Sequence, residues 1–153
     1  MRILETKAYQ FEELDEQTKE KAIDNYRYIG VEDNFWWEYI KEDLISVGIE
    51  LRSFDIERGS FAKIYLKDFS ETCDLILKWH GENCETYKIA ERYIKEYNDI
   101  QYDEDLDKEY EKEFSEEVLS MLRREFEYMT SDEYIIDMFD ANEYEFTDQG
   151  KLI

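Results

Sequence analysis

The chain has 153 residues, of which 42% are hydrophobic and 16% aromatic, and it carries 41 Asp and Glu against 19 Lys and Arg. Its 13 Tyr, 9 Phe and 3 Trp exclude the aromatic-poor composition of disordered acidic chains, and its length predicts one acidic domain over residues 1–153. The net charge of −22 argues against direct binding to DNA, RNA or an anionic membrane, because Lys and Arg bind phosphate groups.

The first predicted element is a strand over residues 2–10, where apolar and polar side chains alternate loosely. A helix follows, for which Asp15 is a suitable N-cap and which should run to about Tyr28. Gly30 lies just beyond that helix, in a position typical of a helix end.

A second helix should begin after Asp33 or Asn34 and end at Gly48. Its apolar residues recur at helical spacing: Trp36, Ile40, Leu44 and Val47. Residues 49–56 and 61–67 then predict a β-hairpin. The four residues of its turn are Glu57, Arg58, Gly59 and Ser60, with the glycine placed for a positive φ angle.

Three helices are predicted next. The first is capped by Ser70 and ends at Gly81, with Leu75, Ile76 and Trp79 facing inward. The second begins at Asn83, and its inward residues are Tyr87, Ala90, Ile94 and Tyr97. The third covers residues 104–129, and its apolar stripe consists of Leu106, Tyr110, Phe114, Val118, Leu122, Phe126 and Met129.

The C-terminal part predicts a short helix and a strand. Ser131 should cap a helix that ends near Asn142, and Tyr144 and Phe146 then alternate with acids in a strand. This strand should pair with either the first strand or the hairpin. The expected fold is therefore α+β, a small, mainly antiparallel sheet packed with five to six helices.

The only histidine, His80, lies between the two cysteines, Cys73 and Cys84. One alternative for the function is a small metal-binding protein or enzyme that uses these three residues, although a structural zinc site needs a fourth ligand. A nucleophilic pair of Cys84 and His80 is a variant of this alternative, without a third group to orient the ring. The favoured interpretation is a non-enzymatic protein with no catalytic residues, no cofactor and no metal ion.

Two cysteines do not make a disulfide framework, which favours a reducing compartment. The first ten residues, MRILETKAYQ, lack the apolar core of a signal peptide, and no apolar run reaches the length of a membrane span. We therefore expect the protein in the cytoplasm of its host cell.

The negative charge is concentrated in the C-terminal part of the chain. Residues 96–153 hold 20 acids and five bases, and residues 96–117 alone hold 11 acids and two lysines. In a helix, Asp103, Asp107 and Glu111 would recur every fourth residue on one face, about 5–6 Å apart. As a helix, residues 96–117 would span about 33 Å. Their net charge of −9 then gives roughly one charge per 3.7 Å, which approaches the charge spacing of a nucleic-acid strand, about one phosphate per 3.4 Å of helix axis. Lys108 and Lys112 interrupt the row and can pair with acids four residues before them.

This pattern predicts that the protein imitates a nucleic acid and blocks a basic nucleic-acid-binding protein of its host. The alternative binding role is that of an antitoxin-like partner for one basic protein. The residues expected to contact the partner are Asp99, Asp103, Glu104, Asp105, Asp107, Glu109, Glu111, Glu113, Glu116, Glu117 and, as an aromatic anchor, Trp37.

Two segments resemble parts of small acidic proteins encoded by phages and prophages. They are residues 9–27, YQFEELDEQTKEKAIDNYR, and residues 142–153, NEYEFTDQGKLI. The resemblance brings no assigned activity and therefore implies no catalytic residues. In size and acidity the chain is also similar to phage anti-restriction and anti-CRISPR proteins, several of which imitate DNA. These similarities imply a phage counter-defence protein directed at a restriction or CRISPR-type system.

Overall fold

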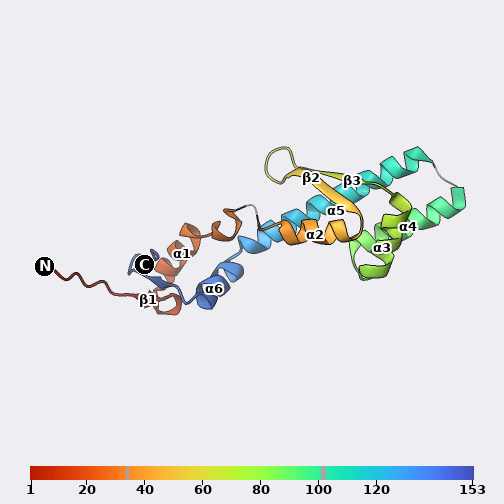
Figure 1. The fold of residues 1–153 in the computed structure, drawn as a ribbon. Helices are drawn as coiled ribbons and strands as arrows, with labels where there is room; N and C mark the ends of the chain where they lie inside the picture. Colours follow the sequence, from red (N-terminus) through yellow and green to blue (C-terminus); the bar gives the residue numbers. More distant parts are fainter. Residues whose placement is uncertain (34, 101–102) are drawn as a thin grey trace. The chain divides into compact units, whose positions relative to one another are not determined.

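The computed structural model describes residues 1–33, 35–100 and 103–153, and its contacts group the chain into two compact units (Figure 1). Unit 1 comprises Met1–Trp36 and Phe126–Ile153, and unit 2 comprises Trp37–Glu125. Six α-helices and four strands in the described ranges confirm the α+β class. The strands form two antiparallel two-stranded sheets in place of the one sheet expected. The single domain over residues 1–153 stays a prediction.

Unit 1 is built from the two ends of the chain. Its elements are β1 (Tyr9–Gln10), the 3₁₀ turn Phe11–Glu13, α1 (Glu16–Asn25), the 3₁₀ turn Ile29–Val31, α6 (Asp132–Ala141) and β4 (Glu145–Phe146). β1 pairs with β4, so that Tyr9 lies opposite Phe146. The last strand therefore pairs with the first strand and not with the hairpin, which was the other partner expected for it. Residues 2–8, expected to belong to the first strand, have no regular structure.

Aromatic rings form the core of unit 1. Phe139 of α6 is 1% exposed, and its ring centroid lies 4.9 Å from that of Phe146 and 5.5 Å from that of Phe11. Tyr26 packs edge-on against Phe139 with a centroid distance of 6.3 Å. Burial of large aromatic side chains therefore stabilises a unit whose sheet has only two residues in each strand.

Unit 2 contains the hairpin and four of the helices. Its elements are α2 (Glu38–Ser46), β2 (Ile49–Asp55), β3 (Phe61–Leu66), α3 (Phe69–Trp79), α4 (Glu85–Ile100) and α5 (Glu104–Met129), of which α5 belongs to unit 2 as far as Glu125. The hairpin and the long helix lie where the sequence predicts them. The second helix begins later than predicted, at Glu38, because residues 35–37 form a turn. Asn34, at the predicted start, lies outside the described residues.

Helices α4 and α5 pack through aromatic side chains. Tyr93 of α4 is 1% exposed and lies edge-on to Tyr110 of α5, with a centroid distance of 5.3 Å. The Tyr93 hydroxyl donates a 2.6 Å hydrogen bond to the Asp107 carboxylate of α5. Phe114 of α5 is fully buried beside Phe69 of α3. The contact between α4 and α5 therefore combines buried aromatic rings with a hydrogen bond to a carboxylate.

Several helix ends differ from the prediction. Asp15 and Ser131 cap α1 and α6 as expected, because their side chains accept the backbone N–H groups of the third residue after each. For α3, however, Asp68 is the cap, and Ser70 already lies inside the helix. The prediction for Trp79 is wrong, since this side chain is 68% exposed.

The turns show where glycine is needed. In the hairpin turn Ser60 has the positive φ angle, at 42°. The φ angle of Gly59 is not positive, so the prediction for this glycine is wrong. Gly48, between α2 and β2, has a φ of 91°, and a Cβ atom there would lie 2.6 Å from the Thr72 hydroxyl. Glycine therefore allows the close approach of this turn to α3.

Candidate functional site

The structure exposes most of the carboxylates that the sequence singles out, all of them in unit 2. The exposed residues are Asp99, Asp103, Glu104, Asp105, Glu109, Glu111 and Glu116. Asp107, Glu113 and Glu117 are only partly exposed. The predicted set thus divides into carboxylates that face solvent and carboxylates that bind within the unit.

The predicted row of Asp103, Asp107 and Glu111 is not a solvent-facing row. Asp107 turns toward α4 and accepts the hydrogen bond of Tyr93. Asp103 precedes α5, and its carboxylate accepts the backbone N–H of Asp105 at 3.0 Å. The fourfold spacing is present in the sequence, but its central member belongs to the α4–α5 interface.

Two other predicted carboxylates are neutralised by arginines of unit 2. Arg92 of α4 lies 2.9 Å from Glu113 of α5, and Arg124 lies 2.9 Å from Glu117 on the same helix. The hydrogen bond from Arg92 to Glu113 raises the pKa of this guanidinium. These pairs lower the negative charge where α4 and α5 meet.

The remaining carboxylates define a different row along α5. Asp105, Glu109 and Glu116 are separated by four and seven residues, so they share one side of the helix over about 16 Å. No ion pair joins them to a lysine or arginine within the described part of the chain. Lys108 and Lys112, which the sequence predicts as partners for nearby acids, form no ion pair with any of the described residues either.

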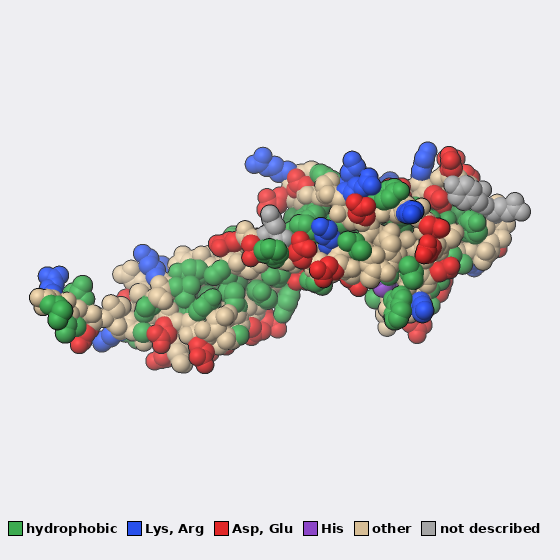
Figure 2. Space-filling model, in the orientation of Figure 1, with side chains coloured by type: hydrophobic (Ala, Val, Ile, Leu, Met, Phe, Trp, Pro, Cys, Tyr) green, Lys and Arg blue, Asp and Glu red, His purple; other side chains and the backbone are tan. Residues whose placement is uncertain are grey.

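A shallow groove between α4 and α5 extends this row. Its volume is about 190 Å³, and Glu116 lines it together with Glu85, Glu113, Glu117 and Arg92. We call Asp105, Glu109, Glu113 and Glu116 of α5, together with Glu85 of α4, the acidic face. In Figure 2 carboxylates and basic side chains are interleaved over the side of unit 2 in view, so the acidity is not a uniform shell. Any specificity therefore depends on particular residues such as those of the acidic face.

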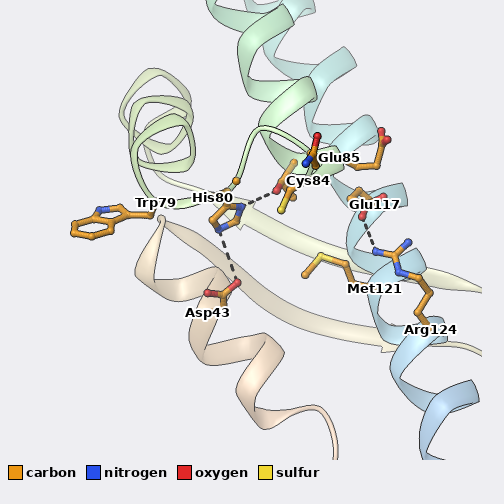
Figure 3. A pocket seen from close by; sticks show the side chains of 11 residues that line it. Asp43, Trp79, His80, Cys84, Glu85, Glu117, Met121 and Arg124 are labelled. Carbon is orange, nitrogen blue, oxygen red and sulfur yellow. Dashed lines mark hydrogen bonds and ion pairs between the residues drawn. The ribbon is translucent and has the colours of Figure 1, made fainter.

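A deeper set of residues beside the groove lines a cavity that shares Glu85 and Glu117 with it. Its volume is about 480 Å³, and α2, the turn between α3 and α4, and α5 all contribute side chains (Figure 3). His80 is the C-cap of α3, and its backbone N–H donates to the carbonyl oxygen of Ile76 at 2.8 Å. We call this space the His80 cavity.

One ring nitrogen of His80 is hydrogen-bonded, and the other faces Asp43 (Figure 3). Its Nδ1 lies 2.6 Å from the hydroxyl of Thr86, a buried residue in the first turn of α4. Its Nε2 is buried and has no hydrogen-bond partner, and the nearest carboxylate oxygen, Oδ2 of Asp43, is 3.8 Å away. Buried polar atoms without a partner are rare in folded proteins, so Nε2 marks this cavity as a candidate site.

Trp37, the predicted anchor, is half-buried and packs edge-on against Phe54 of the hairpin, with a centroid distance of 5.3 Å. The Lys41 ammonium lies 5.5 Å from the centre of its ring. Trp79 is the exposed tryptophan of this region, and Figure 3 shows it pointing away from His80 at the rim of the cavity. Its spacing in α3 predicts a core residue, so no pattern in the sequence indicates this exposure.

The structure does not support the alternative based on Cys73, His80 and Cys84. Cys73 is buried within α3, whereas Cys84 is exposed at the start of α4. The described residues contain no group of three His, Cys, Asp or Glu side chains that could hold a metal ion. The ring nitrogens of His80 face Thr86 and Asp43, so no contact activates the Cys84 thiol.

The two thiols should differ strongly in reactivity. Burial raises the pKa of the Cys73 thiol to about 12, which leaves little thiolate at neutral pH. We expect one thiol, that of Cys84, to react with a disulfide reagent in the folded protein, and the second to react only in denaturant. Counting the protein thiols that react in the folded state and in denaturant checks this prediction. Cys84→Ser should abolish the fast reaction, and fast reaction of both wild-type thiols would contradict the burial of Cys73.

None of the helices in the described ranges combines the length and the apolar character needed to cross a lipid bilayer. Comparison of the chain with protein-family models, with curated proteins and with solved structures gives no match. The function must therefore be argued from the acidic face and the His80 cavity alone.

Proposed function

We propose that the protein binds a basic, nucleic-acid-binding protein through the acidic face of unit 2 and occupies the site where that protein holds its nucleic acid. The observation that carries this proposal is the row of Asp105, Glu109 and Glu116, which are exposed and lack ion-pair partners among the described residues. Unpaired carboxylates keep their full charge for a partner, whereas Glu113 and Glu117 share theirs with arginines.

The packing behind the row supports the same function. Tyr93, Tyr110 and Phe114 are buried, and the contact between the Tyr93 and Tyr110 rings joins α4 to the helix that carries the carboxylates. A rigid display lowers the entropic cost of binding. The resemblance to phage proteins makes a restriction or CRISPR-type nuclease the first class of partner to test.

The proposal predicts that removing the charge of the row abolishes binding. In the triple variant Asp105→Asn, Glu109→Gln and Glu116→Gln, we expect the affinity for the partner to fall by at least about tenfold, because three complementary charges are lost. The partner is first captured from a bacterial lysate on the immobilised protein at low salt. The affinity of wild type and variant for the purified partner is then measured by calorimetry at low and high salt.

The matched control removes the same charges from unit 1. Glu20→Gln, Glu133→Gln and Asp137→Asn change one Asp and two Glu, all exposed and without ion pairs among the described residues. This control should bind like the wild type. Duplex DNA added to the complex should displace the protein from its partner. A partner that duplex DNA does not displace, or that both variants bind equally, would show that the protein does not imitate a nucleic acid.

A further inference from the structure

The segment that precedes β1, residues 2–8, has the alternating pattern of a strand but no partner strand among the described residues. All of its side chains are exposed, and those of Ile3 and Leu4 are 81% and 78% exposed. Within the described ranges the segment forms no hydrogen bond and no ion pair. Figure 1 shows it leading away from β1 as an extended trace. The segment is therefore available to pair with another chain.

The charges of the segment are complementary to those of a second copy. When two copies of residues 3–9 run antiparallel about Thr6, Glu5 of each copy lies directly opposite Lys7 of the other. Directly opposite side chains in such a pair have Cβ atoms about 4.5–5.5 Å apart, where opposite charges attract. Pairing centred on Glu5 or on Lys7 would instead place two like charges opposite each other. The register about Thr6 is therefore favoured over these two neighbouring registers.

The apolar side chains match in the same register. Ile3 of one copy lies opposite Tyr9 of the other, and Leu4 lies opposite Ala8 on the other face of the strand. Tyr9 is half-buried and packs against the aromatic core of unit 1. Ile3 from a second copy would therefore extend this core and leave water, which stabilises the pair.

Strand β1 has a free edge at which this pairing can begin. In its two-stranded sheet β1 pairs only with β4, so the opposite edge has no strand among the described residues. Unpaired backbone groups at a sheet edge are a template for a further strand. The backbone N–H of Gln10 already donates to the Glu13 carboxylate at 2.9 Å. Backbone pairing between two copies should therefore end at Tyr9.

The register also brings a cation to an acidic cluster of unit 1. Arg2 of one copy would lie beside Gln10 of the other, which lines a cavity of about 310 Å³ together with Glu12, Asp140 and Glu143. These three exposed carboxylates have no ion pair in the described part of the chain. The hydrogen bond with Glu12 raises the pKa of Asp140. A guanidinium beside two such neighbouring carboxylates would reduce their repulsion.

We propose that two copies of this chain form a symmetric dimer in which residues 3–9 of each copy pair antiparallel about Thr6. The occupant of the free edge is a second copy because the segment complements itself in charge and in apolar contacts. In a two-fold symmetric dimer the contact between Glu5 and Lys7 occurs twice. The inference is independent of the proposed function.

Sedimentation equilibrium of the full chain over a range of concentrations measures the dissociation constant of the dimer. We expect a reversible dimer for the wild type and a monomer for a variant that lacks residues 2–8. Glu5→Lys should raise the dissociation constant at least about tenfold, because two like-charge contacts replace two favourable ones. Lys7→Glu should do the same. The double variant with both substitutions should bind like the wild type, because opposite charges face each other again. Arg2→Gln should also weaken the dimer.

The matched control is Glu20→Lys, the same change at an exposed residue of α1 outside the segment. It should not weaken the dimer. If only the net charge of −22 mattered, Glu5→Lys would strengthen association, which is the opposite of the result expected here. An equimolar mixture of Glu5→Lys and Lys7→Glu chains should form mixed dimers. A monomeric wild type, a dimer that persists without residues 2–8, or a double variant no tighter than the single variants would overturn the inference.

Discussion

Replacing Phe139 with alanine is expected to lower the free energy of unfolding by about 3–5 kcal/mol, the usual cost of removing a large aromatic side chain from a packed core. Phe139 is 1% exposed and lies in ring contact with four aromatic residues: Phe11, Tyr26, Tyr144 and Phe146. The cavity left behind is lined by Phe11 and Phe146, which are themselves buried and packed against other side chains. This loss is a large fraction of the stability of an ordinary domain.

Urea denaturation followed by circular dichroism measures the change, and amide hydrogen exchange in α6 localises it to unit 1. Phe35→Ala is the matched control, since Phe35 also belongs to unit 1 but is 74% exposed. Its effect should stay within about 0.5 kcal/mol. A Phe139→Ala protein that loses less than about 1 kcal/mol would show that the aromatic cluster does not stabilise unit 1 as described.

The second large effect is expected at alkaline pH and concerns unit 2. Burial, a hydrogen bond to Glu96 and the nearby glutamate charges raise the pKa of the Tyr110 phenol to about 12. Burial and the hydrogen bond to Asp107 raise the pKa of Tyr93 as well. In the unfolded chain both phenols ionise near pH 10. The stability that depends on their neutral form is therefore complete below pH 10 and is lost as the pH rises toward and beyond 12.

For Tyr110, which is 2% exposed, a rise of about two pKa units corresponds to roughly 3 kcal/mol of stability. Urea denaturation at about pH 8 and about pH 11 should show the start of this loss. A spectrophotometric titration should show three of the 13 tyrosines ionising well above pH 10, namely Tyr39, Tyr93 and Tyr110. Tyr93→Phe and Tyr110→Phe should each remove one late phenol. Titration of every tyrosine near pH 10 in the folded protein would contradict the described packing.

The sequence predicts the helices well where hydrophobic spacing and capping agree. The helix over residues 104–129 is found with these bounds, and Leu106, Tyr110, Phe114, Val118 and Leu122 are buried as its stripe predicts. The stripe repeats over many turns, so a local pattern fixes the burial of the helix. The first strand is much shorter than predicted because the alternating residues 2–8 pair with no strand of the described residues, and pairing begins only at Tyr9.

The candidate site is less visible in the sequence. Counting charges finds the acidic helix, but it does not show that Asp107 binds Tyr93 or that Arg92 reaches Glu113 from another helix. The His80 cavity joins Asp43, His80 and Glu117, residues far apart in the chain. Their proximity follows from tertiary packing, which a single sequence with no repeated motif does not reveal.

The pairing of β1 with β4 has a consequence for how the chain is made. Unit 1 takes its residues from both ends of the sequence, while unit 2 is one continuous stretch between them. During translation the whole of unit 2 is synthesised before Phe146, so Tyr9 waits for its partner strand until all of unit 2 has been made. Domains complete in themselves generally fold first on the ribosome. A chain terminated after α5 would thus still contain all of unit 2, but the aromatic cluster around Phe11 would lack Phe139 and Phe146.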